Sequence, residues 1–219
     1  MEVSYAIIVF MNLEKLKDLE AEFLDRYPKG FKDEYFFPTM KKFSPEKLEI
    51  FAKEALKKEN FSNPNLVVEG FFKTVQKSVM VSLFDKLKLR DAIISLNSYE
   101  KDMLSIEIYE LLYGRKKDGF EGLVEFLSEY QLAKWTILSI VPYSLHRKKE
   151  YFIKPTTTKN IIKYLEIKDV VYKPKPSFEF YKNYTKTLNE MKKHLNKNLT
   201  FDNAVFTGFL KVAIEMCEE

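Results

Sequence analysis

Residues 44–75 read SPEKLEIFAKEALKKENFSNPNLVVEGFFKTV and decide the fold, because they contain two helix starts in close succession. Ser44-Pro45 and Asn63-Pro64 each combine an N-cap residue with a proline at the first helical position, where a backbone N–H is not needed. The residues that form one apolar helical stripe after the first start are Leu48, Phe51, Ala52, Ala55 and Leu56. The stretch therefore predicts two consecutive amphipathic helices.

Helical patterns continue on the C-terminal side of this stretch. Asn97 and Glu100 have the spacing of a capping box, which predicts another helix start. Apolar residues recur at helical intervals over 177–195 and 200–214. We therefore expect an all-α or mainly α fold, in which residues 1–219 form a single compact multi-helix domain.

The segment 79–95 is predicted to be a third buried helix, because its apolar residues recur every three or four positions. These residues are Leu83, Leu87 and Ile94, with Phe84, Leu89 and Ile93 beside them. Arg90 and Asp91 lie among them, which favours a buried or half-buried ion pair that fixes the register of the helix.

Two short β-prone runs interrupt the helical pattern. Tyr151-Phe152-Ile153 and Val170-Val171-Tyr172 are rich in aromatic and β-branched residues, and prolines surround them. They predict either a small β-hairpin near 151–173 or unpaired extended chain.

The N-terminal segment and the single cysteine indicate the compartment. The apolar run over 5–11 is too short to span a bilayer and follows Glu2 rather than basic residues, so neither a membrane helix nor a signal peptide is expected. Residues 1–10 are interpreted as a first helical turn, an added strand or an N-terminal extension. Cys217 has no cysteine to pair with in the chain, which suits a cytoplasmic protein.

Positive charge is concentrated in one region of the chain. The whole protein has a formal net charge of +4, but residues 145–197 contain fourteen of the 36 basic residues and only five acidic ones. Aromatic residues alternate with these lysines, a mixture that proteins use to bind single-stranded nucleic acid. The 145–197 region therefore predicts a basic face for nucleic acid or another polyanion. The alternative is a lysine-rich solvated surface over an aromatic core.

The sharpest local feature within this region is Lys154-Pro155-Thr156-Thr157-Thr158-Lys159. A helix that starts at the threonines would direct free backbone N–H groups, hydroxyls and ammonium groups toward an anion. Arg147 and Lys173 belong to the same basic region and are expected to close the site from the other side. The alternative is an ordinary helix cap, in which a threonine only completes the first turn.

Signals of enzymatic chemistry are weak. The two histidines, His146 and His194, are far apart, and no His or Cys cluster has the spacing of a zinc site, so no metal site is expected. There is no glycine-rich phosphate loop or dinucleotide fingerprint, and no cofactor is expected. We therefore expect a non-enzymatic binding or interaction protein. The alternatives are an enzyme that acts on a small phosphorylated or acidic molecule bound at 156–159, and a structural or homo-oligomeric subunit.

Several stretches together resemble a family of uncharacterised bacterial proteins of similar length. They are VSLFDKLKLRDAI (81–93), LAKWTILSIVPY (132–143), YFIKPTTTKNIIKYLEI (151–167), VYKPKPSFEFYKNYTKTLNEMKK (171–193) and DNAVFTGFL (202–210). The most specific parts are the F-x-K-P-T-x-T-K string and the aromatic run after Pro176. The resemblance implies a genuine single-domain protein, and it implies no activity.

Overall fold

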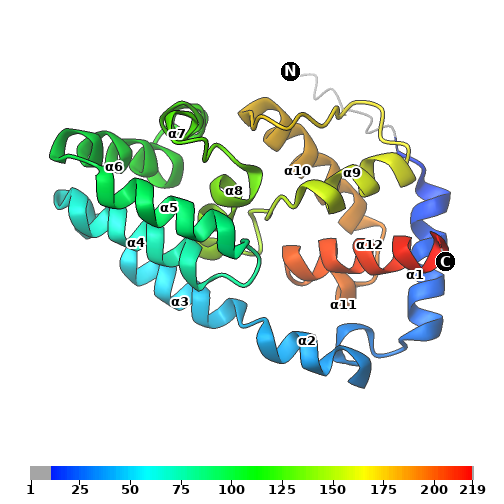
Figure 1. Cartoon of the computed structure of the whole chain (residues 1–219). Helices are drawn as coiled ribbons and strands as arrows, with labels where there is room; N and C mark the ends of the chain where they lie inside the picture. The colour runs from blue at the N-terminus through cyan, green and yellow to red at the C-terminus, as the bar shows by residue number, and fades with distance from the viewer. Residues whose placement is uncertain (1–10, 219) are drawn as a thin grey trace, which may run out of the picture.

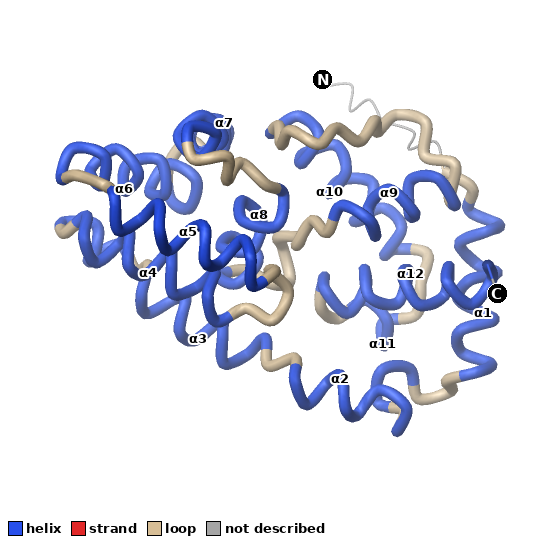
Figure 2. The backbone as a smooth tube through the Cα atoms, in the orientation of Figure 1, coloured by secondary structure: helices blue, strands red, loops and turns tan. Residues whose placement is uncertain are grey.

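The computed structural model describes residues 11–218, and within them the protein is built from helices joined by loops, the longest of which covers residues 165–177 (Figures 1 and 2). The first helices are α1 (Leu13–Arg26), α2 (Phe37–Lys42), α3 (Pro45–Ala55), α4 (Pro64–Lys77), α5 (Leu83–Ser95) and α6 (Ser98–Tyr113). The others are α7 (Lys116–Glu129), α8 (Trp135–Leu145), α9 (Pro155–Tyr164), α10 (Phe178–Lys193), α11 (Lys197–Thr200) and α12 (Asn203–Glu218). Short 3-10 turns lie at 30–32, 34–36 and 58–62. The predicted all-α fold is confirmed, and residues 1–10 lie outside the described part.

The helices form two groups that share one hydrophobic core. Figure 1 shows α3 to α8 on one side and α1 with α9 to α12 on the other, while α2 connects the two along the lower edge. The central helix is α8, in which every residue except Thr136 is buried. It packs against α3, α4 and α7, whereas α12 packs against α1, α9 and α11.

The helix starts predicted at Ser44-Pro45, Asn63-Pro64 and Asn97 are confirmed. α3 begins at Pro45 and α4 at Pro64, and the Asn63 side chain accepts hydrogen bonds from the two backbone amides that follow Pro64. Asn97 and Glu100 form the predicted capping box at the start of α6. Each of these features depends on neighbours in the sequence, which is why the pattern alone located them.

The β-prone runs form unpaired extended chain rather than a hairpin. No strand is present in residues 11–218. The backbone amide of Ile153 donates to Ser139 Oγ at 2.9 Å, and that of Tyr151 donates to the Tyr181 hydroxyl at 3.2 Å. Because side chains of α8 and α10 satisfy these amides, the segment needs no partner strand.

The predicted burial of the third helix was wrong. In α5 the side chains of Leu83, Phe84 and Ile94 are about 70% exposed, and among the apolar residues only Leu89 is fully buried. The Arg90–Asp91 ion pair forms at 2.8 Å, but it too is exposed. The reason is that α5 packs mainly on α4, so only a narrow face of it is covered.

Candidate functional site

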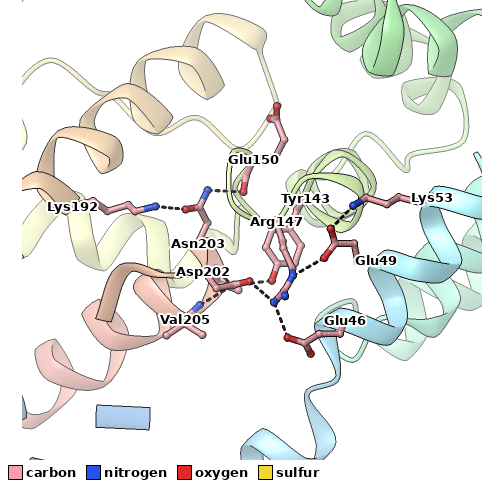
Figure 3. Close-up of polar contacts among 11 residues, drawn as sticks. Glu46, Glu49, Lys53, Tyr143, Arg147, Glu150, Lys192, Asp202, Asn203 and Val205 are labelled. Atoms are coloured by element: carbon pink, nitrogen blue, oxygen red, sulfur yellow. Dashed lines mark hydrogen bonds and ion pairs between the residues drawn. The ribbon is translucent and has the colours of Figure 1, made fainter. Parts of the chain in front are cut away.

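Arg147 lies at the centre of an ion-pair network instead of facing an anion site (Figure 3). Its Nε donates to Glu49 Oε2 at 2.7 Å, and its Nη1 lies 2.9 Å from Glu46 Oε1 and 2.9 Å from Asp202 Oδ2. The Arg147 side chain is only 16% exposed. Three carboxylates therefore already compensate this guanidinium, and the predicted anion site does not include it.

Asp202 couples this network to the start of α12. Its Oδ1 accepts hydrogen bonds from the backbone amides of Ala204 at 2.8 Å and Val205 at 3.2 Å, and from the Tyr143 hydroxyl at 3.2 Å. Burial and the neighbouring Asp202 carboxylate raise the pKa of Tyr143, so the phenol remains a hydrogen-bond donor. All of these groups have partners, which indicates a structural role.

The start of α9 differs from the expected threonine cap. The helix begins at Pro155, its N-cap residue is Lys154, and no side chain caps it. The amide of Thr158 already donates to the Lys154 carbonyl at 2.9 Å. The amides of Thr156 and Thr157 precede Thr158 in the first turn, so the helix offers them no carbonyl partner. The free amides thus lie about one residue earlier than expected, and the prediction that a threonine is the cap was wrong.

A hollow of about 270 Å³ opens beside this helix start, and we call it the α9 hollow. Its polar side chains are Lys154, Thr157, Thr158, Tyr184, Thr207 and Lys211. They come from the first turn of α9, from α10 and from α12, which are brought together only by the fold. Lys211 also pairs with the exposed Glu215 at 2.7 Å, and this carboxylate lies on the next turn of α12.

Tyr184 is the unusual member of the α9 hollow. Its side chain is 1% exposed, and its hydroxyl is buried without a hydrogen-bond partner among the described residues. Burial raises the pKa of Tyr184, while the nearby Thr158 hydroxyl acts in the opposite direction without forming a hydrogen bond of good geometry. Within residues 11–218 the phenol is therefore a donor without an acceptor in good hydrogen-bond geometry, which is rare because such a group costs free energy.

Besides Arg147, three residues of the predicted anion site do not line the α9 hollow. Thr156 is exposed, and the ammonium of Lys159 lies 6.0 Å from the centre of the Tyr172 ring. Lys173 lines a separate hollow together with Asp169 and Glu179, and its carbonyl accepts a hydrogen bond from the Trp135 indole at 2.8 Å. The structure thus brings together Lys154, Thr157 and Thr158 from the predicted set.

Two further hollows adjoin the α9 hollow around Val79 and Met80, in the loop between α4 and α5. The apolar hollow, of about 450 Å³, lies between that loop, α2 and α12, and the Lys47 hollow, of about 290 Å³, lies between the loop and α3. All three share Val79 and Met80, and we call them together the Val79 cleft.

The Val79 cleft has a uniform charge. The lysines that line it are Lys42, Lys47, Lys77, Lys154 and Lys211. No aspartate or glutamate of the described chain lines any of its three hollows. A concave surface with charges of one sign attracts ligands of the opposite sign, so this cleft favours anions.

The aromatic residues of the 145–197 region lie mostly in the core. Tyr151, Phe152, Phe180, Tyr181 and Tyr184 are buried, and the other three, Tyr164, Tyr172 and Phe178, are half-buried. They form no exposed stacking platform between the lysines. The region therefore agrees with the alternative of a solvated lysine surface over an aromatic core.

Within residues 11–218, no helix is long and apolar enough to cross a membrane. The described side chains also include no group of three or more His, Cys, Asp or Glu residues that is placed to hold a metal ion. The chain matches no protein-family model, no curated protein and no solved structure. The resemblance to an uncharacterised bacterial family stays a prediction, and any functional proposal depends on the Val79 cleft.

Sequence reasoning missed Tyr184, Thr207 and Lys211. Tyr184 has the helical spacing of a core residue, and Lys211 lies in a different helix from the other lysine of the α9 hollow, Lys154. No local pattern could have selected them, because a residue's position along a helix does not reveal which other helix it faces.

Proposed function

We propose that this protein binds a small phosphorylated or carboxylated molecule in the α9 hollow. The observation that carries the proposal is the buried Tyr184 hydroxyl, which has no hydrogen-bond partner within residues 11–218, on a residue that lines a hollow with two lysines and a helix N-terminus. Helix N-termini bind anions through free amides and the helix dipole. All of these donors can bind the same kind of group, an anionic oxygen.

Lys154 and Lys211 are expected to supply most of the attraction for the anion. Changing either residue to glutamine should weaken the binding of inorganic phosphate about tenfold or more, since a hydrogen bond to a charged group contributes roughly 1.5–3 kcal/mol. The measurement is an NMR titration that follows the backbone amides of Thr156 and Thr157, and these amides should shift until the site is saturated.

Lys159→Gln is the matched control for this experiment. It removes the same charge from the same helix as Lys154, but Lys159 does not line the α9 hollow. Its phosphate affinity should remain within about twofold of the wild-type value, because a lysine outside the hollow acts on the anion only at long range, where salt screens its charge. Amide shifts that depend only on ionic strength, with sodium chloride as effective as phosphate, would refute the proposed function.

Tyr184→Phe separates a ligand-binding role from a structural one. If the hydroxyl serves only a bound anion, its removal should leave the stability of the free protein unchanged or slightly higher, because an unsatisfied buried donor disappears. The affinity for phosphate should fall at least fivefold. Thermal unfolding with and without phosphate measures both effects. A large loss of stability without phosphate would assign the hydroxyl to the fold.

Nucleic acid remains the rival partner, and exposed lysines of the 145–197 region support it. Lys163, Lys182 and Lys186 are exposed, and they form no ion pair within residues 11–218. Because the neighbouring aromatic side chains lie in the core, such binding would rely on phosphate contacts alone. A filter-binding titration at several salt concentrations tests it, since the affinity should fall steeply as salt rises. Tyr184→Phe should not affect this binding.

The third alternative, a structural or homo-oligomeric subunit, is supported by the exposed apolar side chains of α5. Leu83, Phe84 and Ile94 are each about 70% exposed. Their surface lies on a helix that contributes no residue to the Val79 cleft. Association through α5 is therefore compatible with anion binding and does not compete with it.

A further inference from the structure

We infer that the ligand of the Val79 cleft is amphipathic: an anionic head, phosphate or carboxylate, in the α9 hollow and an alkyl or aryl group in the apolar hollow beside it. This inference rests on the proposed function, because it extends the anion site into its neighbour. It names the chemical class of the ligand.

The apolar hollow is the larger of the two and is lined mainly by carbon. Its side chains include Phe31, Met40, Phe43 and Val205. The two polar side chains that line it, Thr39 and Lys42, both belong to α2, in which no residue is fully buried. A hollow of about 450 Å³ with such a lining favours an apolar group over a second charged one.

The two hollows adjoin along a shared wall. Val79, Met80, Ala204 and Gly208 line both of them. Gly208 has no side chain, so α12 places no bulk between the hollows at this position. An ideal Cβ there would meet only the end of the Phe31 ring, at 3.6 Å. One molecule can therefore occupy both hollows at once.

The charges select the orientation of the ligand. Lys154 and Lys211 line the α9 hollow but not the apolar hollow, and the same is true of Tyr184, whose hydroxyl has no partner within residues 11–218. The apolar hollow contains one lysine, Lys42, on its exposed α2 side. The anionic end therefore belongs beside α9 and the apolar end beside α2.

The test is a calorimetric titration with inorganic phosphate and with n-alkyl phosphates from butyl to octyl, below their micelle concentrations. Affinity should rise roughly threefold for each added methylene until the apolar hollow is full, as expected for apolar surface removed from water. Lys154→Gln should weaken all members of the series by a similar factor, because it acts on the head group.

Gly208→Leu should remove the chain-length dependence while inorganic phosphate still binds, because its side chain would fill the apolar hollow. Gly208→Ala is the matched control and should keep the full dependence, since its Cβ makes only an ordinary contact. If Gly208→Leu fails to fold, Thr39→Trp fills the same hollow from exposed α2 and should give the same result.

The outcomes distinguish this inference from the proposed function. If phosphate binds but octyl phosphate binds no tighter, the inference is refuted and the anion site stands. If neither compound binds, both fail. A concentration-dependent dimer that Gly208→Leu dissociates, with no gain in affinity from butyl to octyl phosphate, would assign the apolar hollow to a second copy of the chain and overturn the inference.

Discussion

Asp202→Ala is expected to lower the free energy of unfolding by about 3 kcal/mol or more, the range found when one partner of a buried ion pair is removed. The Asp202 carboxylate is 1% exposed and serves Arg147, Tyr143 and two amides at the start of α12. Its loss leaves the buried Tyr143 hydroxyl without its acceptor and α12 without its cap. Urea unfolding measures the effect as a lower midpoint.

Two companion variants divide this effect into its causes. Asp202→Asn retains an oxygen that can cap α12 and should recover about 1 kcal/mol relative to Asp202→Ala. Arg90→Ala removes an exposed ion pair and should change stability by less than about 0.5 kcal/mol. If Asp202→Ala were no more destabilising than Arg90→Ala, the network in Figure 3 would not link α12 to α3 and α8.

Gly119→Ala is expected to destabilise the protein by about 3 kcal/mol or more, or to prevent folding. An ideal Cβ at Gly119 would lie 2.1 Å from the backbone nitrogen of Leu111 and 2.7 Å from the carbonyl oxygen of Glu107. Both atoms belong to the backbone of α6, so α6 and α7 would have to separate. Overpacking of this kind typically costs about 1–3 kcal/mol. The cost is highest for a clash with backbone atoms, because these atoms can shift least.

Gly208→Ala is the matched control for this prediction. It also replaces a glycine within a helix, but its Cβ meets only the Phe31 ring at 3.6 Å. Alanine should therefore stabilise α12 by about 0.5–1 kcal/mol through its better helix propensity. Thermal unfolding of the two variants should give shifts of opposite sign, and equal shifts would contradict the close approach of α6 and α7.

The features that the sequence predicted correctly depend on short-range chemistry. Asn63 accepts from the amides of Asn65 and Leu66 at 3.1 and 3.4 Å, so proline and the cap act within four residues. The Asn97 and Glu100 capping box spans the same distance along the chain. Such interactions form wherever the helix lies in the fold, and pattern reasoning can therefore find them.

The features that the sequence did not predict depend on distant partners. Arg147 was expected to face an anion, but it pairs with Glu49, 98 residues away, and Asp202, 55 residues away. The extended chain at 151–153 needs no partner strand because Ser139 and Tyr181 satisfy its amides. Neither arrangement leaves a trace in local periodicity.

The candidate site contains residues that the sequence predicted and residues that only the fold revealed. Lys154, Thr157 and Thr158 were predicted because they surround one helix start. Tyr184 and Lys211 reach the same hollow from α10 and α12, and their role depends on how these helices pack. The charge count of the 145–197 region did not reveal which lysines share this hollow, because Lys211 lies outside the region. The count also included Arg147, whose charge is compensated by carboxylates.

The position of α2 has a kinetic consequence. Because α2 has no fully buried residue, its local opening should require much less free energy than global unfolding, and its amides should exchange with deuterium faster than those of α4 or α8. α2 also lines the apolar hollow through Thr39, Met40 and Lys42, so an alkyl chain bound there would contact it. A ligand bound in the apolar hollow should therefore slow the exchange of the α2 amides.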